Sequence, residues 1–245
     1  MSRSGPSSPA LPLIGLAHGS RHPGVAEGIQ QLLAATAELT GAATRAAYLD
    51  LTTPDLDTVV AELAAAGDRS AVVVPLLFTD AFHARVDVPA AVVQAAEVSG
   101  VELALASILG TGDDVVDVVA ERLGAAEVDP REPVLLFAVG SSRPDANAAV
   151  AGVAARLAER RGVAVRAGFG TCEPRAAEVL GDLRRLSERP GTVVPLFVAP
   201  GLLLDGIAPD VEAAGWRLAD PLGTLLAPLV SHRYHAAIRA RQGLH

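Results

Sequence analysis

The sequence predicts an α/β fold made of two similar lobes, each built around a parallel β-sheet, with a cleft between them. Strand-like and helix-like segments alternate along the first half of the chain. The strand-like segments are nearly continuous apolar runs, which is typical of parallel strands covered by helices on both faces. The second half repeats the motifs of the first half in the same order. We therefore interpret the chain as a tandem duplication of one unit.

Four strands and four helices are expected in the first half. The strands are predicted over residues 11–17, 44–51, 71–78 and 101–107, and the helices over residues 24–38, 54–66, 86–98 and 112–124. Thr53 is the expected N-cap of the second helix, with Pro54 as its first residue and Gly67 at its end, since proline favours helix starts and glycine favours helix ends. A polar segment, EVDPREP, then leads into the second half.

The repeat is clearest in two pairs of motifs. LIGLAHGSRHP matches LLFAVGSSRP, and VVVPLLFTDAFHARVDVP matches TVVPLFVAPGLLLDGIAP. In the second pair, Pro75 and Pro89 stand 120 residues before Pro195 and Pro209. These matches predict a tail over residues 1–10, an N-terminal lobe over 11–128 that carries the active site, and a degenerate C-terminal lobe over 129–245.

Composition excludes several classes of function. The formal net charge is −8 and only 3% of residues are aromatic, so nucleic-acid binding is not expected. All twenty cationic side chains are arginine, and a chain without lysine cannot form a Schiff base or a P-loop. No apolar run reaches the ~18 residues that span a bilayer, so no membrane partner is expected. A single cysteine and an N-terminus without an apolar run predict a soluble cytoplasmic protein.

Three side chains able to bind metals or protons follow the predicted strands of the first half. His18 ends the first strand, Asp50 ends the second, and His83 follows the third. Ligands bind beyond the carboxyl ends of parallel strands, so these side chains are predicted to converge on an open site for iron, cobalt or nickel. The second half has lost all three, and the aligned residues there are Val139, Gly170 and Leu203. One lobe thus keeps the chemistry and the other keeps the fold.

The same residues also have structural interpretations. A histidine at a strand end is often an ordinary hydrogen-bonded residue, and Asp50 alone could cap a turn. A further prediction concerns anions, because the Gly-Ser turn that contains Ser20 would offer backbone N–H groups at a helix N-terminus. Three arginines could meet a large polyanion from both lobes, or be ordinary surface residues, namely Arg21, Arg85 and Arg143.

Three of these motifs resemble those of a known family. GLAHGSRHPG, AYLDLTTPDL and VVPLLFTDAFHARVDVPAAV, in this order, resemble the class II chelatases that act on sirohydrochlorin. The resemblance implies two flavodoxin-like lobes, no permanently bound cofactor, and insertion of Fe(II) or Co(II) into a tetrapyrrole for sirohaem or cobalamin synthesis. It also implies that His18 and His83 are the active-site histidines. Asp50 stands where the family commonly has a glutamate.

These residue types suit metal insertion. Two pyrrole N–H protons leave the macrocycle as the metal enters, and a neutral histidine can hold the metal or accept a proton. A site with few ligands can also release its metal. Arginines and backbone amides would orient the carboxylates of sirohydrochlorin. Iron is slightly favoured over cobalt because the chain has no His-rich tail.

Two other functions fit part of the pattern. A non-catalytic carrier of metal or tetrapyrrole could use the same lobes. A histidine-phosphatase-like phosphoryl-transfer enzyme also places histidine beside arginine and glycine, but in the order Arg-His-Gly, whereas this chain has His-Gly-Ser-Arg. Two lobes already supply both walls of a cleft, so a monomer would suffice, and a homodimer remains open.

Overall fold

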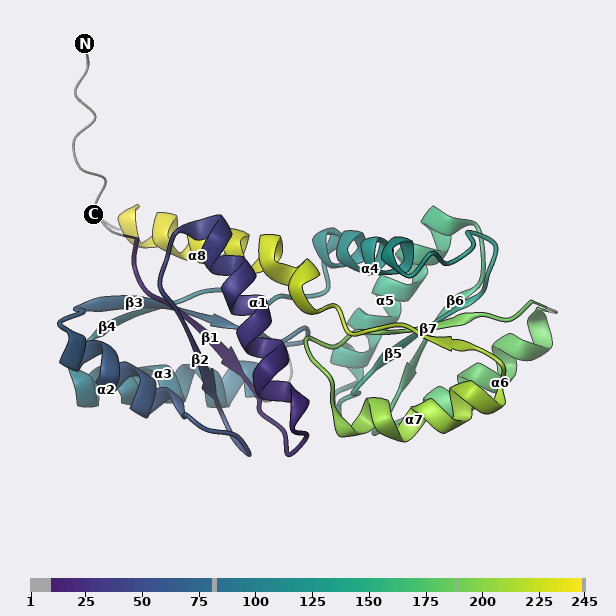
Figure 1. The fold of residues 1–245 in the computed structure, drawn as a ribbon, viewed down its shortest axis with the longest axis horizontal. Coiled ribbons are helices and arrows are strands. Elements are labelled where there is room, and N and C mark those ends of the chain that lie inside the picture. Colours follow the sequence, from purple (N-terminus) through teal and green to yellow (C-terminus); the bar gives the residue numbers. More distant parts are fainter. Residues whose placement is uncertain (1–9, 81–82, 188, 244–245) are drawn as a thin grey trace, which may run out of the picture.

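The computed structural model describes residues 10–80, 83–187 and 189–243, with the backbone alone for residues 83 and 84. This part of the chain forms two four-stranded parallel sheets (Figure 1). The first has the order β2-β1-β3-β4, and the second has the matching order β6-β5-β7-β8. The strands are β1 (Leu13–Ala17), β2 (Thr44–Tyr48), β3 (Ser70–Pro75), β4 (Glu102–Leu105), β5 (Val134–Ala138), β6 (Val165–Phe169), β7 (Thr192–Pro195) and β8 (Arg217–Leu218). The predicted fold class is confirmed.

Helices cover both faces of each sheet. The central strands β1 and β5 are buried along their whole length, which explains why their sequences are continuous apolar runs. The helices are α1 (Gly24–Thr40), α2 (Leu56–Ala66), α3 (Val88–Ser99), α4 (Asp113–Ala125), α5 (Pro144–Arg161), α6 (Ala176–Leu186), α7 (Leu202–Ala213) and α8 (Ala227–Gln242), with a π-helical turn η1 (His83–Asp87) and a 3-10 turn η2 (Gly223–Leu226). Within the described residues, no helix combines the length and the apolar character that a membrane span requires.

The start of α2 corrects the sequence prediction. Thr53 is not the N-cap, because Asp55 is still extended (φ −76°, ψ 173°) and bridges to the end of β2. The Asp55 carboxylate caps the helix instead and accepts a hydrogen bond from the N–H of Thr58 (2.9 Å). Gly67 ends the helix in the left-handed conformation, as predicted. A bridge to a neighbouring strand therefore outweighed the local preference of proline for the first helical turn.

The last helix of each half lies on the sheet of the other half. Helix α4 packs against α5 and β7, whereas α8 packs against α1, β3 and β4 (Figure 1). The buried Tyr234 on α8 donates a hydrogen bond to the carbonyl of Leu11 (2.7 Å). Arg233, also on α8, pairs with Asp114 (2.6 Å) at the start of α4. The division at residues 128/129 remains a prediction about units of sequence, and the two units exchange their terminal helices in space.

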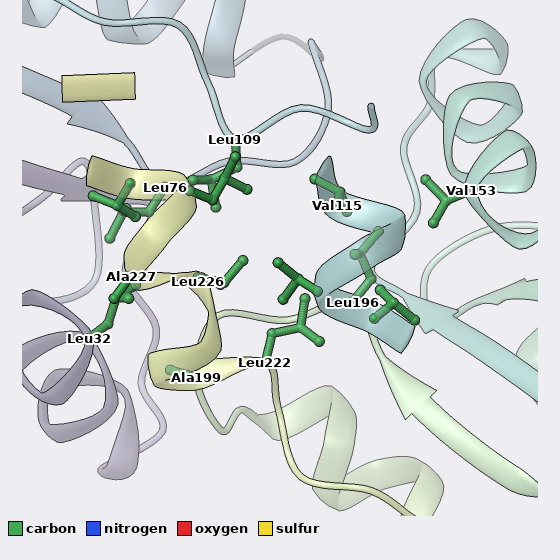
Figure 2. Packing of buried hydrophobic residues seen from close by; sticks show 14 of the residues in the cluster. Leu32, Leu76, Leu109, Val115, Val153, Leu196, Ala199, Leu222, Leu226 and Ala227 are labelled. Atoms are coloured by element: carbon green, nitrogen blue, oxygen red, sulfur yellow. The ribbon is translucent and has the colours of Figure 1, made fainter. Parts of the chain in front are cut away.

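One hydrophobic core runs through both halves. Buried residues of the first sheet, such as Leu13 and Leu76, belong to the same cluster as Leu136 and Leu196 of the second sheet. Figure 2 shows how residues of α4, η2 and the loop before it fill the space between the sheets. Two smaller clusters lie on the outer faces, one under α2 and α3 and one under α6 and α7. The shared core therefore fixes how the two sheets face each other.

Candidate functional site

A cavity of about 770 Å³ is lined by residues of both halves. Its lining segments, residues 17–20, 76–79, 138–142 and 196–203, contain the ends of β1 and β5 and follow directly on β1, β3, β5 and β7. In each sheet these are the two strands between which the strand order reverses. Ligands of open α/β sheets bind at this point, and the volume is in the range of small-molecule sites.

His18 lies on the wall of this cavity, directly after β1. Its side chain is positioned by the backbone that follows. Gly19 has φ +94°, and a Cβ there would stand 1.8 Å from the carbonyl oxygen of Asp50. Thr52 Oγ1 accepts a hydrogen bond from the N–H of Ser20 (3.0 Å) and donates one to the carbonyl of Ser20 (2.9 Å). The loop after His18 is thus locked against the loop after β2. Ser20 also lines the cavity.

The second half repeats this arrangement without the imidazole. Val139 lines the cavity at the position equivalent to His18 and is 45% exposed. Gly140 has φ +91°, and the Asn147 side chain holds Ser141 through both its N–H (2.9 Å) and its carbonyl (2.8 Å). Thr171 Oγ1 donates a hydrogen bond to the carbonyl of Val139 (2.8 Å). The scaffold of the site is therefore retained in both halves, while the imidazole is retained in one.

Asp50 lies beside His18 in the backbone but not in the cavity wall. Its N–H donates to the carbonyl of His18 (2.9 Å), while its exposed carboxylate accepts from the N–H of Leu51 (2.8 Å). Its counterpart in the second half is Thr171, whose N–H donates to the carbonyl of Val139 (2.9 Å). The sequence alignment that paired Asp50 with Gly170 was wrong by one residue. The segment from the end of the strand to the following proline is one residue shorter in the second half.

The side chain of His83 lies outside the described residues, so its approach to His18 stays a prediction. Its backbone begins the π-helical turn η1, in the segment between β3 and α3. Among the side chains that the structure describes, no three His, Cys, Asp or Glu residues lie close enough together to hold a metal ion. In the described part of the chain, His18 is therefore the candidate metal ligand in the cavity wall.

The three predicted anion-binding arginines do not line the cavity. Arg21 is exposed, and Arg85 donates from Nε to Asp80 (2.7 Å). Arg143 donates to Asp145, and the pKa of the Arg143 guanidinium is raised by this hydrogen bond, by the charge of Asp145 and by the charge of Asp80. Asp80 follows β3 and Arg143 follows β5, so this last attraction acts between the two halves. The roles of these arginines stay predictions.

Several contacts around the site were missed by sequence reasoning. His22 accepts a hydrogen bond at Nδ1 from the N–H of Gly24 (3.0 Å), which leaves Nε2 to meet Asp205 of α7 (3.3 Å) across the two halves. Thr52 and Asn147 hold the loops after β1 and β5 through hydrogen bonds, a role that the sequence analysis did not assign to either residue. The apolar part of the wall was also missed, although the valine at position 139, in place of the histidine at position 18, already indicated an apolar residue there.

This arrangement suits weak binding of a metal ion beside a largely apolar ligand. A neutral imidazole is a good ligand for iron, cobalt and nickel, and it can also accept a proton. The rest of the wall is mostly apolar, with the hydroxyl groups of Ser20, Thr79, Ser141, Ser142 and Thr171 and the amide of Asn147. The fold and the site define a two-lobed α/β protein whose ligand site lies at the switch points of both sheets.

The chain belongs to the CbiX family, whose family model matches residues 12–126 and 133–234, one match in each half. This confirms the resemblance noted in the sequence. The chain is 27% identical to the sirohydrochlorin ferrochelatase of Priestia megaterium over 91% of this chain and 89% of that protein. It is 28% identical to the sirohydrochlorin ferrochelatase of Bacillus subtilis over 67% of this chain, and the match spans 65% of that protein's length.

Solved structures agree with the sequence comparison. The structure described as SirB from Bacillus subtilis with Fe³⁺ has a TM-score of 0.78 and 25% identity, and the match covers 96% of this chain and 98% of that chain. SirB of Bacillus subtilis subspecies spizizenii, a sirohydrochlorin chelatase solved in complex with cobalt, has a TM-score of 0.75 and 23% identity, covering 96% and 97% of the two chains. At 23% identity, the cobalt complex supports the fold alone.

Proposed function

We propose that this protein is a sirohydrochlorin chelatase that inserts Fe(II) or Co(II) into the macrocycle. The supporting observation is the position of His18 on the wall of a cavity formed at the switch points of both sheets. Membership of the CbiX family and two relatives named sirohydrochlorin ferrochelatase support the same substrate. The histidine-phosphatase alternative gains no support, because Arg21 does not line the cavity with His18.

In this proposal, His18 and His83 bind the incoming ion and accept the protons that leave the pyrrole nitrogens. The imidazoles must be neutral when they bind metal, and each can carry away one proton once the metal has moved into the ring. Asp50 assists from the neighbouring loop, through the backbone contact with His18. A side chain that binds the ion loosely favours its transfer to the four nitrogens of the macrocycle.

The carboxylates of sirohydrochlorin are proposed to meet Ser20 and the arginines Arg21, Arg85 and Arg143. Arg85 and Arg143 are paired with Asp80 and Asp145, so a substrate carboxylate would compete with these partners. Bidentate pairs between arginine and carboxylate are strong and directional, and they can orient the ring. We further propose iron as the physiological metal, a cytoplasmic location, and a monomer as the working unit.

Anaerobic incubation of the purified protein with sirohydrochlorin and Fe(II), followed by absorbance, tests the proposal. We expect metallation well above the spontaneous rate, and a loss of about 100-fold or more in His18→Ala. His232→Ala is the matched control, since His232 is exposed on α8 and does not line the cavity at His18. If metallation is no faster than without protein, the protein is not a chelatase, and the non-catalytic carrier is the function that remains. Parallel assays with Co(II) test the metal preference.

A further inference from the structure

The two walls of the cavity differ at the positions of the predicted active-site histidines. Leu16 pairs with Pro75 in the first sheet, and Phe137 pairs with Pro195 in the second. Leu16 and Phe137 are therefore equivalent residues of the two halves, and so are Pro75 and Pro195. Three polar residues of the first half become apolar in the second. His18, Thr79 and His83 correspond to Val139, Ala199 and Leu203, and these three apolar residues all line the cavity. At these positions the second half has hydrocarbon side chains in place of two imidazoles and a hydroxyl group, while its remaining polar wall residues are Ser141, Ser142, Asn147 and Thr171.

This hydrocarbon surface is open to the cavity. Val139 is 45% exposed and Leu202, the first residue of α7, is 58% exposed, and both line the cavity. Phe197 and Leu203 line it beside them and are partly buried. Single exposed apolar residues are common on any protein surface. A set that lines one cavity, beside an imidazole, is instead typical of a binding surface.

From this asymmetry we infer that the second half is a platform that binds one flat face of the tetrapyrrole. We define the platform as Val139, Phe197, Leu202 and Leu203. The inference rests on the proposed function and assigns the division of labour within it. The first half holds the metal at one face of the ring, and the platform covers the opposite face.

The chemistry of the ligand supports this assignment. The face of a tetrapyrrole is apolar, whereas its carboxylates lie at the edge, so an aliphatic wall gains free energy by covering a face. Aliphatic side chains neither coordinate a metal nor accept hydrogen bonds from the pyrrole N–H groups. A histidine at position 139 would do both and would hold the ion on the wrong side. Val139 therefore both binds the ring and keeps the metal on the side of His18.

The test is binding of metal-free sirohydrochlorin, measured by anaerobic fluorescence titration without metal. We expect Leu202→Ser and Val139→Ser to raise the Kd about tenfold each, because each variant removes hydrocarbon that the bound ring would cover. Leu202→Met should restore binding. Leu186→Ser is the matched control, because Leu186 is 62% exposed at the end of α6 and does not line the cavity. Co(II) binding in the absence of tetrapyrrole should be the same in all variants.

The outcomes separate the two proposals. If the wild-type protein binds and metallates sirohydrochlorin but both serine variants bind it as well as the wild type, the platform is refuted and the proposed function stands. If the serine variants lose Co(II) binding to the same extent as ring binding, their effect is structural and the platform is again refuted. If the wild-type protein does not bind the ring, both proposals are wrong.

Discussion

Gly19→Ala is the sharpest test of how the site is built, because Gly67 provides a matched control. Gly19 and Gly67 have nearly the same φ, +94° and +95°. A Cβ at position 19 would stand 1.8 Å from the carbonyl oxygen of Asp50, whereas a Cβ at position 67 would meet no atom within 4 Å. Both alanine variants therefore carry the same backbone cost, about 1–2 kcal/mol for a left-handed non-glycine residue. Only Gly19→Ala adds a collision.

The collision has a predictable size. Real Cβ atoms essentially never approach another heavy atom closer than 3.0 Å, so the Asp50 carbonyl must move by more than 1 Å. This carbonyl accepts a hydrogen bond from the N–H of Thr52 (2.7 Å), and the Asp50 N–H donates to His18 (2.9 Å). Losing these two bonds costs roughly 2 kcal/mol. We expect Gly19→Ala to lower the free energy of unfolding by about 2 kcal/mol more than Gly67→Ala does, or by ~4–8 °C in Tm.

Urea-induced unfolding of both variants measures this difference, and the chelation assay measures its effect on His18. Gly19→Ala should lose activity because the loop that follows His18 has moved, while Gly67→Ala should keep it. Equal unfolding free energies for the two variants, together with full activity of Gly19→Ala, would refute the idea that close packing of two loops positions the imidazole.

Two further predictions concern stability. The pKa of Asp55 is lowered by its hydrogen bonds with Thr58. The ionised carboxylate therefore contributes its full share to the free energy of unfolding above about pH 4, and this share is lost as the pH falls through the folded-state pKa. In urea titrations, the free energy of unfolding of Asp55→Asn should approach that of the wild type as the pH falls through this range. Arg233→Met removes hydrogen bonds to the carbonyls of Ile108 and Leu109 and the pair with Asp114, and should cost about 2–4 kcal/mol in urea unfolding, whereas exposed Arg239→Met should cost less than about 0.5 kcal/mol.

Much of the fold could be predicted because buried parallel strands have a distinct sequence. The runs at 11–17 and 71–78 are apolar on both faces, and only a strand covered on both sides needs that pattern. The exchange of α4 and α8 could not be predicted in the same way. An apolar helix face shows that the helix is buried, but both sheets offer it an equivalent surface. The same limit applied to α2, where the end of a neighbouring strand moved the N-cap to Asp55.

The candidate site could be predicted in part. His18 lies on the cavity wall because it directly follows a central strand, and its catalytic and metal-binding roles stay predictions. Asp50 follows an outer strand, and its carboxylate accepts a hydrogen bond from the N–H of Leu51 in a turn, which agrees with the structural alternative that the sequence left open. Arg143 was predicted to bind an anion, but the sequence already held a competing partner in Asp145. The apolar wall could not be predicted, because apolar residues after a strand fit a buried core as well as a cavity wall.

The exchange of α4 and α8 suggests how such an asymmetric chain could arise. Two copies of a one-lobed protein that traded terminal helices would form a symmetric pair, with identical histidines on both walls of a shared groove. Joining the copies in one polypeptide would make this association permanent. Each wall could then change independently, because a substitution no longer appeared twice. Specialisation of the groove into a reactive side and a passive side is a freedom that a symmetric pair does not have.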